Sequence, residues 1–280
     1  MAYRHNVMRR VGRALPRAGL ALVITIGVIT AATWTSWAHI DRDHRSGAAA
    51  ETTSQAHALA PDQIRRVLAF GDSVPTGKNC DCVAFPGLVA DALQASRGHP
   101  VQLDNLGIDG STAVELLQSL NDGDEQQREV ARADLILVTT GANDLLPAQE
   151  DRLLADSDPN AEQALINDTG GVLRLVLARI RELNPSAQVL ITTYWNVFRD
   201  GRAEPDPGEL AWNDAMTRSF NAVLTGAAHD NGAQVVDLYR PFKGDGSLDP
   251  TGLLADDGDH PNAAGHQVIA EAIVRTLSGG

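Results

Sequence analysis

The sequence is poor in lysine, and what basic charge it has is unevenly placed. Only Lys78 and Lys243 are lysines, and five of the 23 basic residues are arginines within residues 1–38, which contain no acidic residue. The remaining 18 basic residues stand against 36 acidic ones, so residues 39–280 carry a net charge of −18. A nucleic-acid-binding domain needs a basic face. We therefore expect no nucleic-acid partner.

Cysteine is also scarce, with Cys80 and Cys82 the only two in the chain. Their C-x-C spacing has no second pair and no histidine close by in the sequence, unlike a zinc cluster. The acidic run Asp245–Asp259 does not match the spacing of an EF-hand. We therefore expect neither a metal nor a cofactor. Residues two apart in an extended chain fall within disulfide reach, so a bridge and two free thiols both remain open.

Long uncharged runs are absent except at the start of the chain. Residues 18–38 carry no charge and no proline, follow an arginine-rich segment, and match the roughly 20 residues of a membrane-spanning helix. Trp34 and Trp37 suit the outer membrane interface, whereas Ser36-Trp37-Ala38 is typical of a signal-peptide cleavage site. Residues 1–38 are therefore predicted to be an export signal or a membrane anchor, with the rest of the chain outside the cytoplasm. Residues 39–62 are polar and aperiodic, which predicts a flexible linker.

Residues 63–280 alternate between short apolar runs and longer segments of helical periodicity. The expected strands are 67–70, 101–106, 135–140, 189–193 and 235–238, and the expected helices include 85–95, 112–120, 172–183, 210–228 and 263–277. Near-continuous apolar strands that alternate with helices predict one α/β domain, with a central parallel sheet covered on both faces. The acidic segment 147–160 is predicted to be a surface insertion.

Four polar turns that contain glycine are candidates for a site. Three follow the first three strands and include Ser73, Gly107 and Asn143, and the fourth contains His260 and precedes the last helix. Ligands of open α/β sheets bind at the carboxyl ends of the strands. We therefore expect these turns to meet at one edge of the sheet.

The residue types in these turns suit nucleophilic catalysis. A serine hydroxyl needs a base, for which His260 is the candidate. The histidine in turn needs a carboxylate, and Asp257 can fold back to it, although Asp256 and Asp259 are also near in sequence. An oxyanion would need N–H donors, which the backbone of Ser73, the backbone of Gly107 and the amide of Asn143 can offer. Simpler interpretations also exist for two of these residues. Gly107 would then be an ordinary turn glycine, and Asn143 would cap a helix.

These residues resemble the SGNH hydrolase family, the GDSL-type esterases and lipases, over residues 66–277. The matching blocks are Gly71-Asp72-Ser73, the Gly107 turn, Gly141-Ala142-Asn143-Asp144 and Asp257-Gly258-Asp259-His260, with Val74 where the family name has leucine. The resemblance implies a flavodoxin-like three-layer α/β/α sandwich in residues 63–280. It also implies Ser73 as nucleophile, His260 as general base and Asp257 as its orienting acid, with an oxyanion hole of Ser73, Gly107 and Asn143. The sequence lacks the G-x-S-x-G elbow of ordinary α/β-hydrolases.

We therefore expect an exported, monomeric serine hydrolase that cleaves small-molecule or polymer-linked carboxylic esters through an acyl-enzyme on Ser73. One alternative within the same fold is a polysaccharide O-acetyl esterase. Another, from a different class, is a catalytically silent binding module of the cell envelope. Trp195 and Phe198 follow the fourth expected strand, where they would either line a substrate wall or pack in the core.

Overall fold

The computed structural model describes residues 63–279. The predicted export signal or anchor (1–38) and linker (39–62) lie outside these residues and stay predictions. Within residues 63–279, no helix is both long enough and apolar enough to cross a membrane.

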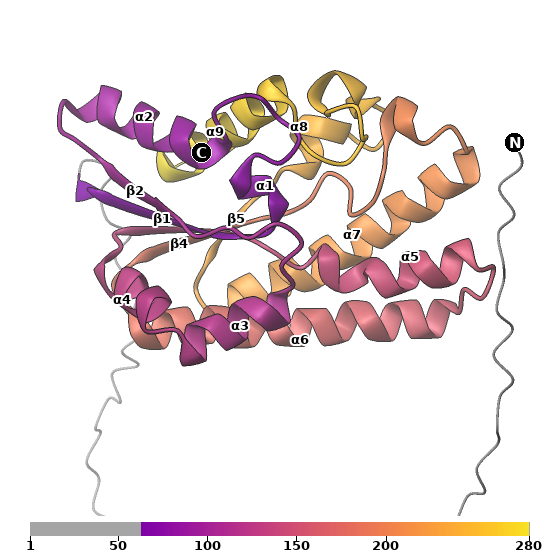
Figure 1. Cartoon of the computed structure of the whole chain (residues 1–280), viewed down its shortest axis with the longest axis horizontal. Helices are drawn as coiled ribbons and strands as arrows, with labels where there is room; N and C mark the ends of the chain where they lie inside the picture. Colours follow the sequence, from indigo (N-terminus) through magenta and orange to yellow (C-terminus); the bar gives the residue numbers. More distant parts are fainter. Residues whose placement is uncertain (1–62, 280) are drawn as a thin grey trace, which may run out of the picture. The chain divides into compact units, whose positions relative to one another are not determined.

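A parallel sheet of five strands forms the centre of the described residues (Figure 1). In chain order the strands are β1 (Arg66–Gly71), β2 (Gln102–Asn105), β3 (Leu135–Thr139), β4 (Gln188–Thr192) and β5 (Gln234–Val236). Their spatial order is β2-β1-β3-β4-β5, and every neighbouring pair is parallel. This is the flavodoxin-like strand order. The expected strands are confirmed, with ends displaced by one or two residues.

Helices cover both faces of the sheet and complete the three-layer sandwich (Figure 1). One face carries α3 (Ala113–Asp122), α4 (Asp124–Arg132), α6 (Pro159–Leu183) and α7 (Pro207–Asp230), and the other carries α2 (Phe85–Arg97), α8 (Tyr239–Lys243) and α9 (Ala263–Leu277). Short elements complete the chain: α1 (Ser73–Thr76), η2 (Asn143–Leu145), α5 (Leu146–Leu153), η3 (Gly201–Ala203) and η4 (Pro250–Leu253). The expected α/β sandwich is therefore confirmed.

Strand β1 shows how the sequence builds both cores. Its side chains alternate, so that Leu68 and Phe70 join the cluster under α3 and α6 whereas Val67 and Ala69 join the cluster under α2 and α9. All four are almost completely buried. Burial of a side chain the size of valine, leucine or phenylalanine stabilises a fold by roughly 1.5–3 kcal/mol. A strand buried on both faces is apolar along most of its length, and β1 is a continuous apolar run from Val67 to Phe70.

The predicted surface insertion 147–160 is helical. It contains most of α5 and the start of α6, which begins at Pro159 after Asp158 caps it by accepting a hydrogen bond from the Asn160 N–H (2.9 Å). Helix α6 therefore starts well before residue 172. The pair Gly170-Gly171 interrupts the helical signal in the sequence. In the structure a Cβ on Gly170 would lie 2.9 Å from Val223 of α7, so this glycine allows α6 and α7 to pack closely.

Candidate active site

The turn after β1 places Ser73 at the carboxyl edge of the sheet. Gly71 has φ +145°, and a Cβ there would lie 1.8 Å from the carbonyl oxygen of Thr139 on β3, so the turn requires glycine. Asp72 accepts a hydrogen bond from the Val74 N–H (2.9 Å) and so caps α1. Ser73 is the first residue of this short helix. The turn is thus fixed by backbone geometry on one side and by a helix cap on the other.

Ser73, His260 and Asp257 form a continuous chain of hydrogen bonds. Ser73 Oγ lies 2.7 Å from His260 Nε2, and His260 Nδ1 lies 2.7 Å from Asp257 Oδ2. Asp259 Oδ2 is 3.8 Å from the same Nδ1. Of the acidic residues that the sequence left open, the structure therefore brings Asp257 into hydrogen-bond contact with the histidine. The arrangement can remove a proton from Ser73 and stabilise the imidazolium that results.

The Asp257 carboxylate is held by donors on both oxygens. Partial burial alone would raise its pKa, but the pKa of Asp257 is lowered to about 2 by hydrogen bonds from the Asp259 N–H, the Asn79 side chain and His260. Its Oδ1 accepts from the backbone N–H groups of Asp259 (3.0 Å) and His260 (3.1 Å). Asp257 is therefore ionised at neutral pH and fixed in orientation, as the partner of a histidine base must be.

The loop that carries His260 ends at helix α9. Asn262 caps this helix by accepting from the N–H groups of Ala264 (2.9 Å) and Gly265 (3.1 Å). Pro261, which suits a first helical position by its type, lies one residue before the cap and pairs with Leu254 in an isolated bridge. The bridge and the cap together anchor the residue that follows His260.

The expected oxyanion donors differ in their placement. Asn143 lines the pocket that contains Ser73 and His260, and its amide donates one hydrogen bond to the Ser111 carbonyl (2.9 Å), which leaves the second amide hydrogen for another acceptor. Gly107 lies against Pro75 and Thr76 of α1, and its N–H donates to Asn105 Oδ1 (3.2 Å). The Gly107 N–H would have to share or leave this bond to contact an oxyanion.

Sequence reasoning missed the partner of Asp72. Tyr194, just after β4, donates its hydroxyl to Asp72 Oδ2 (2.5 Å), although the two residues are 122 positions apart. Burial raises the pKa of Asp72 to about 6, while the bonds from Tyr194 and the Val74 N–H oppose this rise. Burial beside this carboxylate also raises the pKa of Tyr194 well above its ordinary value. The motif signals only a turn aspartate, and nothing in the sequence marks Tyr194 as its partner.

The two cysteines form a disulfide, which decides between the two possibilities left open by the sequence. Cys80 and Cys82 are bridged with a Cα–Cα distance of 5.2 Å. Although no histidine is close to the two cysteines in the sequence, a ring nitrogen of His266 and the two sulfur atoms lie within 4.8 Å of one another. His266 is fully buried, accepts a hydrogen bond from the Phe85 N–H at Nδ1 (3.2 Å) and joins α9 to α2. This contact between α9 and α2 is consistent with a structural role for His266.

A small pocket opens beside Ser73. Its volume is about 140 Å³, and its walls include Leu146, Tyr194, Trp195 and Phe198. Trp195 stacks on Phe242 (4.4 Å between ring centroids), and Phe198 stacks on Trp212 (5.1 Å). Trp195 and Phe198 therefore do both things considered from the sequence, since they pack in the core and also line the pocket.

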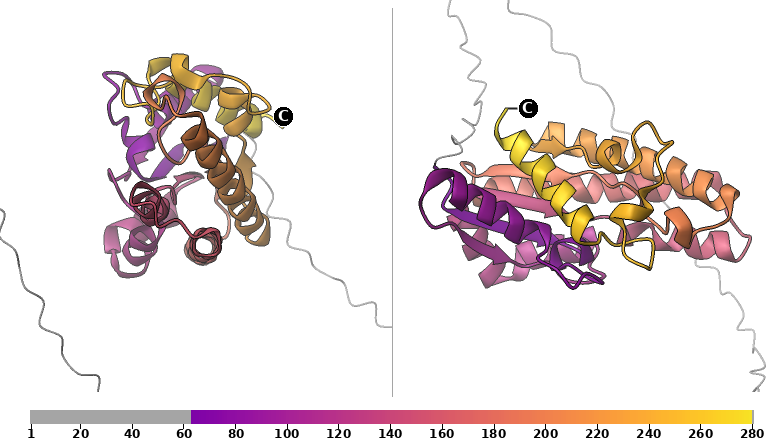
Figure 2. Two further views of the ribbon diagram at one scale, coloured as in Figure 1. Left: turned by 90° about the vertical axis from the view of Figure 1, so that its right-hand side faces the viewer. Right: turned by 90° about the horizontal axis from the view of Figure 1, so that it is seen from above.

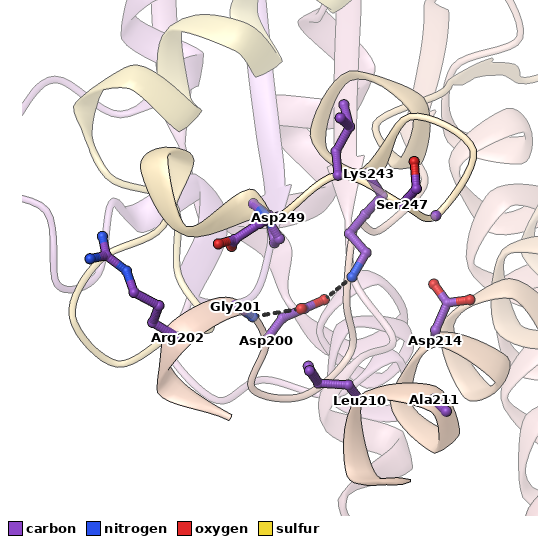
Figure 3. A pocket seen from close by; sticks show the side chains of 12 residues that line it. Asp200, Gly201, Arg202, Leu210, Ala211, Asp214, Lys243, Ser247 and Asp249 are labelled. Carbon is purple, nitrogen blue, oxygen red and sulfur yellow. Dashed lines mark hydrogen bonds and ion pairs between the residues drawn. The ribbon is translucent and has the colours of Figure 1, made fainter. Parts of the chain in front are cut away.

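A second, larger hollow lies along the same loop. Arg199 lines the Ser73 pocket, and the next residue, Asp200, lines a hollow of about 480 Å³ in which Asp200 and Lys243 point toward each other and form a buried ion pair (Figure 3). The N–H of Asp200 also donates to the carbonyl of Gly258, next to Asp257 (2.8 Å). The wall of the larger hollow is thus bonded directly to the turn that carries His260.

Comparison with known proteins agrees with this fold. The sequence matches the GDSL-like Lipase/Acylhydrolase family over residues 69–268, so the chain belongs to that family and is a carboxylic ester hydrolase. No curated protein matches the chain.

Several solved structures share the fold. The lipase Lip_vut3 from a goat rumen metagenome has a TM-score of 0.65 at 22% identity, covering 77% of this chain and 98% of its own. A lipase/acylhydrolase from Enterococcus faecalis has a TM-score of 0.54 at 20% identity, covering 77% of this chain and 96% of its own. The acetylxylan esterase Axe2 from Geobacillus stearothermophilus has a TM-score of 0.54 at 20% identity (76% and 94%).

Proposed function

We propose that Ser73 is the nucleophile of this ester hydrolase, with His260 as its general base and Asp257 as the acid that orients His260. The observation that carries the proposal is the pair of 2.7 Å contacts that joins the three side chains. Ser73 Oγ attacks the ester carbonyl while its proton passes to His260 Nε2, and the alcohol leaves with that proton. Water then attacks the acyl-enzyme by the same route, which releases the acid and restores Ser73.

The tetrahedral intermediates carry a negative oxygen that needs donors already in place. We propose the Ser73 N–H, the Gly107 N–H and the Asn143 amide for this role. The position of Asn143 in the pocket wall supports its inclusion. Because the Gly107 N–H donates to Asn105 Oδ1, it must share or leave this hydrogen bond before it can bind the oxyanion.

Replacement of Ser73 tests the nucleophile. Ser73→Ala should lower the turnover number by roughly 10⁴-fold or more, because the nucleophile is lost while the fold is kept. Ester hydrolysis and covalent labelling by a fluorophosphonate are both measured. Ser119→Ala on α3 is the matched control, since the Ser119 hydroxyl donates to the Leu116 carbonyl of its own helix (2.8 Å). Near-normal hydrolysis by Ser73→Ala would contradict the proposal, and absence of labelling at Ser73 in the unchanged protein would favour the silent binding module.

We further propose that the acyl group is short. The pocket of about 140 Å³ is well below the roughly 300–1,000 Å³ of sites for drug-sized ligands. The kcat/KM for p-nitrophenyl acetate should exceed that for p-nitrophenyl decanoate by at least about tenfold, which needs only about 1.4 kcal/mol of steric cost. Leu146→Ala removes a half-exposed side chain from the pocket wall and should bring the kcat/KM values for the two esters closer together. Equal values for the two esters in the unchanged protein would contradict a short-acyl pocket.

A polysaccharide O-acetyl esterase is the second candidate. The small pocket suits an acetyl group, and the larger hollow at Asp200 offers space for further parts of a polymer. Release of acetate from acetylated xylan, compared with p-nitrophenyl acetate, separates this activity from that on small esters. We also propose that the enzyme is a monomer that works outside the cytoplasm, either secreted or held at the outer face of the membrane through residues 18–38.

A further inference from the structure

We propose that Asn79 is a positioning residue for Asp257, and that the Cys80–Cys82 disulfide keeps Asn79 in place. Ester hydrolysis by this protein then depends on the disulfide. The inference rests on the proposed roles of Ser73, His260 and Asp257, and it adds a residue and a covalent bond that the triad motif does not contain.

The hydrogen bond from Asn79 to Asp257 links the segment that begins at Ser73 with the turn that carries His260. The Asn79 amide donates to Asp257 Oδ2, which is the oxygen that also accepts from His260 Nδ1. The other donors to Asp257 among the described residues, the N–H groups of Asp259 and His260, belong to its own turn. Asn79 therefore ties the acid to a segment of the chain 178 positions away, the one that begins at Ser73.

The path from Ser73 to Asn79 is short and well bonded. The Lys78 N–H donates to the Ser73 carbonyl (3.1 Å), and the Cys80 N–H donates to the Gly77 carbonyl (3.1 Å). Between them Asn79 has φ +58°, a left-handed conformation that asparagine tolerates better than most residues. The nucleophile and the residue that holds the acid are thus parts of one compact turn.

The disulfide lies directly after Asn79. Its ring spans three residues, so it removes little chain entropy from the unfolded state, and its effect must be local. The sulfur atoms lie beside His266 of α9, the helix that follows His260. The bridge therefore restricts the backbone next to Asn79 and places it against the helix that anchors the catalytic turn.

A metal ion is a poor alternative at this position. Both sulfur atoms are bonded to each other, so neither is a thiolate. His266 Nδ1 accepts the Phe85 N–H, which puts the proton of the neutral ring on Nε2 and leaves no free lone pair on the ring. The structure thus favours a disulfide with a mechanical role.

The experiment compares Asn79→Gly, Asn79→Asp and the double variant Cys80→Ser/Cys82→Ser in the full-length protein. Glycine adopts a positive φ without strain, so Asn79→Gly removes the amide and keeps the turn. We expect it to lower kcat at least about tenfold, the effect of a lost hydrogen bond to a charged group, with KM within twofold. Asn79→Asp places a second carboxylate at Asp257 and should lower kcat further.

The pH–rate profile separates positioning from mere loss of folded protein. Without the Asn79 donor, less of the Asp257 charge is offset by hydrogen bonds, so this charge favours the imidazolium more strongly and the acid limb of the pH–rate profile should move to higher pH in Asn79→Gly. The other acidic groups near this site, Asp259 beside His260 and Asp72 beside Ser73, are unchanged in the variant. Rates are expressed per active site titrated with a fluorophosphonate, which removes any difference in folded fraction.

The cysteine variants test the bridge. Cys80→Ser/Cys82→Ser should lower kcat about fivefold, a coupling of the size found between neighbouring residues, and the triple variant with Asn79→Gly should match Asn79→Gly alone. Dithiothreitol should lower the unchanged enzyme to the level of the double variant. It reduces the bridge with two electrons and two protons to two thiols, and becomes a cyclic disulfide. Asp81→Asn, an exposed position inside the ring, is the matched control and should retain full activity.

The outcomes are distinct. Wild-type kcat and an unmoved acid limb in Asn79→Gly would overturn the role of Asn79. A further fivefold loss in the triple variant would show that the bridge acts independently of Asn79 and would overturn its proposed role. If the unchanged protein is not labelled at Ser73, the proposed function fails instead.

Discussion

Asp72 lies between Gly71 and Ser73, and the negative charge of its buried carboxylate opposes folding. It is almost completely buried, and burial raises its pKa from 3.8 to about 6. The folded protein therefore holds this proton more tightly than the unfolded chain does. The resulting stabilisation is complete below pH 3.8 and is lost as the pH rises through about 6.

Asp72→Asn should remove this dependence, because the amide is neutral at every pH. Between pH 4 and pH 7, the free energy of unfolding of the variant should gain about 2.4 kcal/mol relative to the unchanged protein. Chemical denaturation at each pH measures it. Asp91→Asn, an exposed substitution on α2, serves as the control. Parallel pH curves for the unchanged protein and Asp72→Asn would contradict a proton held by Asp72.

For individual residues, the sequence indicates contacts between neighbours in the chain better than contacts between distant positions. Asp257 and His260 lie three residues apart in one turn, so spacing makes Asp257 a candidate partner of His260 together with Asp256 and Asp259, and the structure selects Asp257. The bonds from Tyr194 to Asp72 and from Asn79 to Asp257 join residues 122 and 178 positions apart. Nothing in an asparagine or a tyrosine indicates which distant carboxylate it will meet.

Helices α2 and α9 lie side by side on one face of the sheet (Figure 2), and His266 is a polar link between them. Burial lowers the pKa of His266 from 6.5 to about 4. The unfolded chain therefore binds this proton first as the pH falls. The neutral imidazole favours the folded state fully above pH 6.5, and this contribution is lost as the pH drops through about 4.

His266→Gln should reduce the acid sensitivity of the α2–α9 pair, since glutamine can accept from the Phe85 N–H and does not titrate. From pH 7 to pH 4, the unchanged protein should lose about 3 kcal/mol of unfolding free energy that the variant does not lose. Denaturation followed by circular dichroism measures the difference. His229→Gln is the control, because the His229 side chain is 91% exposed. An equal loss in His266→Gln would show that another group senses the acid.

The elements themselves were predictable where one physical signal dominates. The central strands β1, β3 and β4 are nearly continuous apolar runs because both of their faces are covered, whereas the edge strand β2 is mostly polar and partly exposed. Helix α6 was predicted only from residue 172, because its first half is polar and is followed by two glycines. In the structure α6 continues through both glycines, and Gly170 lies close to Val223 of α7, a contact that the sequence does not reveal.

At the scale of the whole molecule, we propose that residues 1–38 direct the hydrolase out of the cytoplasm. A reporter that is active only outside the cytoplasm, fused after residue 280, should therefore be active. Leu22→Asp with Ile26→Asp interrupts the apolar run and should abolish the signal, because each charge opposes membrane insertion by about 2.5–3.5 kcal/mol. Gln55→Asp in the segment 39–62 is the control.

The same fusion protein also tests whether formation of the Cys80–Cys82 disulfide depends on export from the cytoplasm. Disulfides persist in oxidising compartments and are rare in the cytosol. The Cys80–Cys82 bridge should thus form in the exported protein and be missing from the retained variant, as thiol alkylation and mass spectrometry would show. A reporter equally active in the charged variant would contradict export through this segment.

The hydrogen bond between Ser73 and His260 spans 187 positions of the chain. During synthesis Ser73 emerges early, whereas His260 emerges only shortly before α9 is made. With the roles proposed for these two residues, a nascent chain that lacks His260 carries a serine without a base to activate it. Esterase activity is then expected only after the segment that carries His260 has been translated.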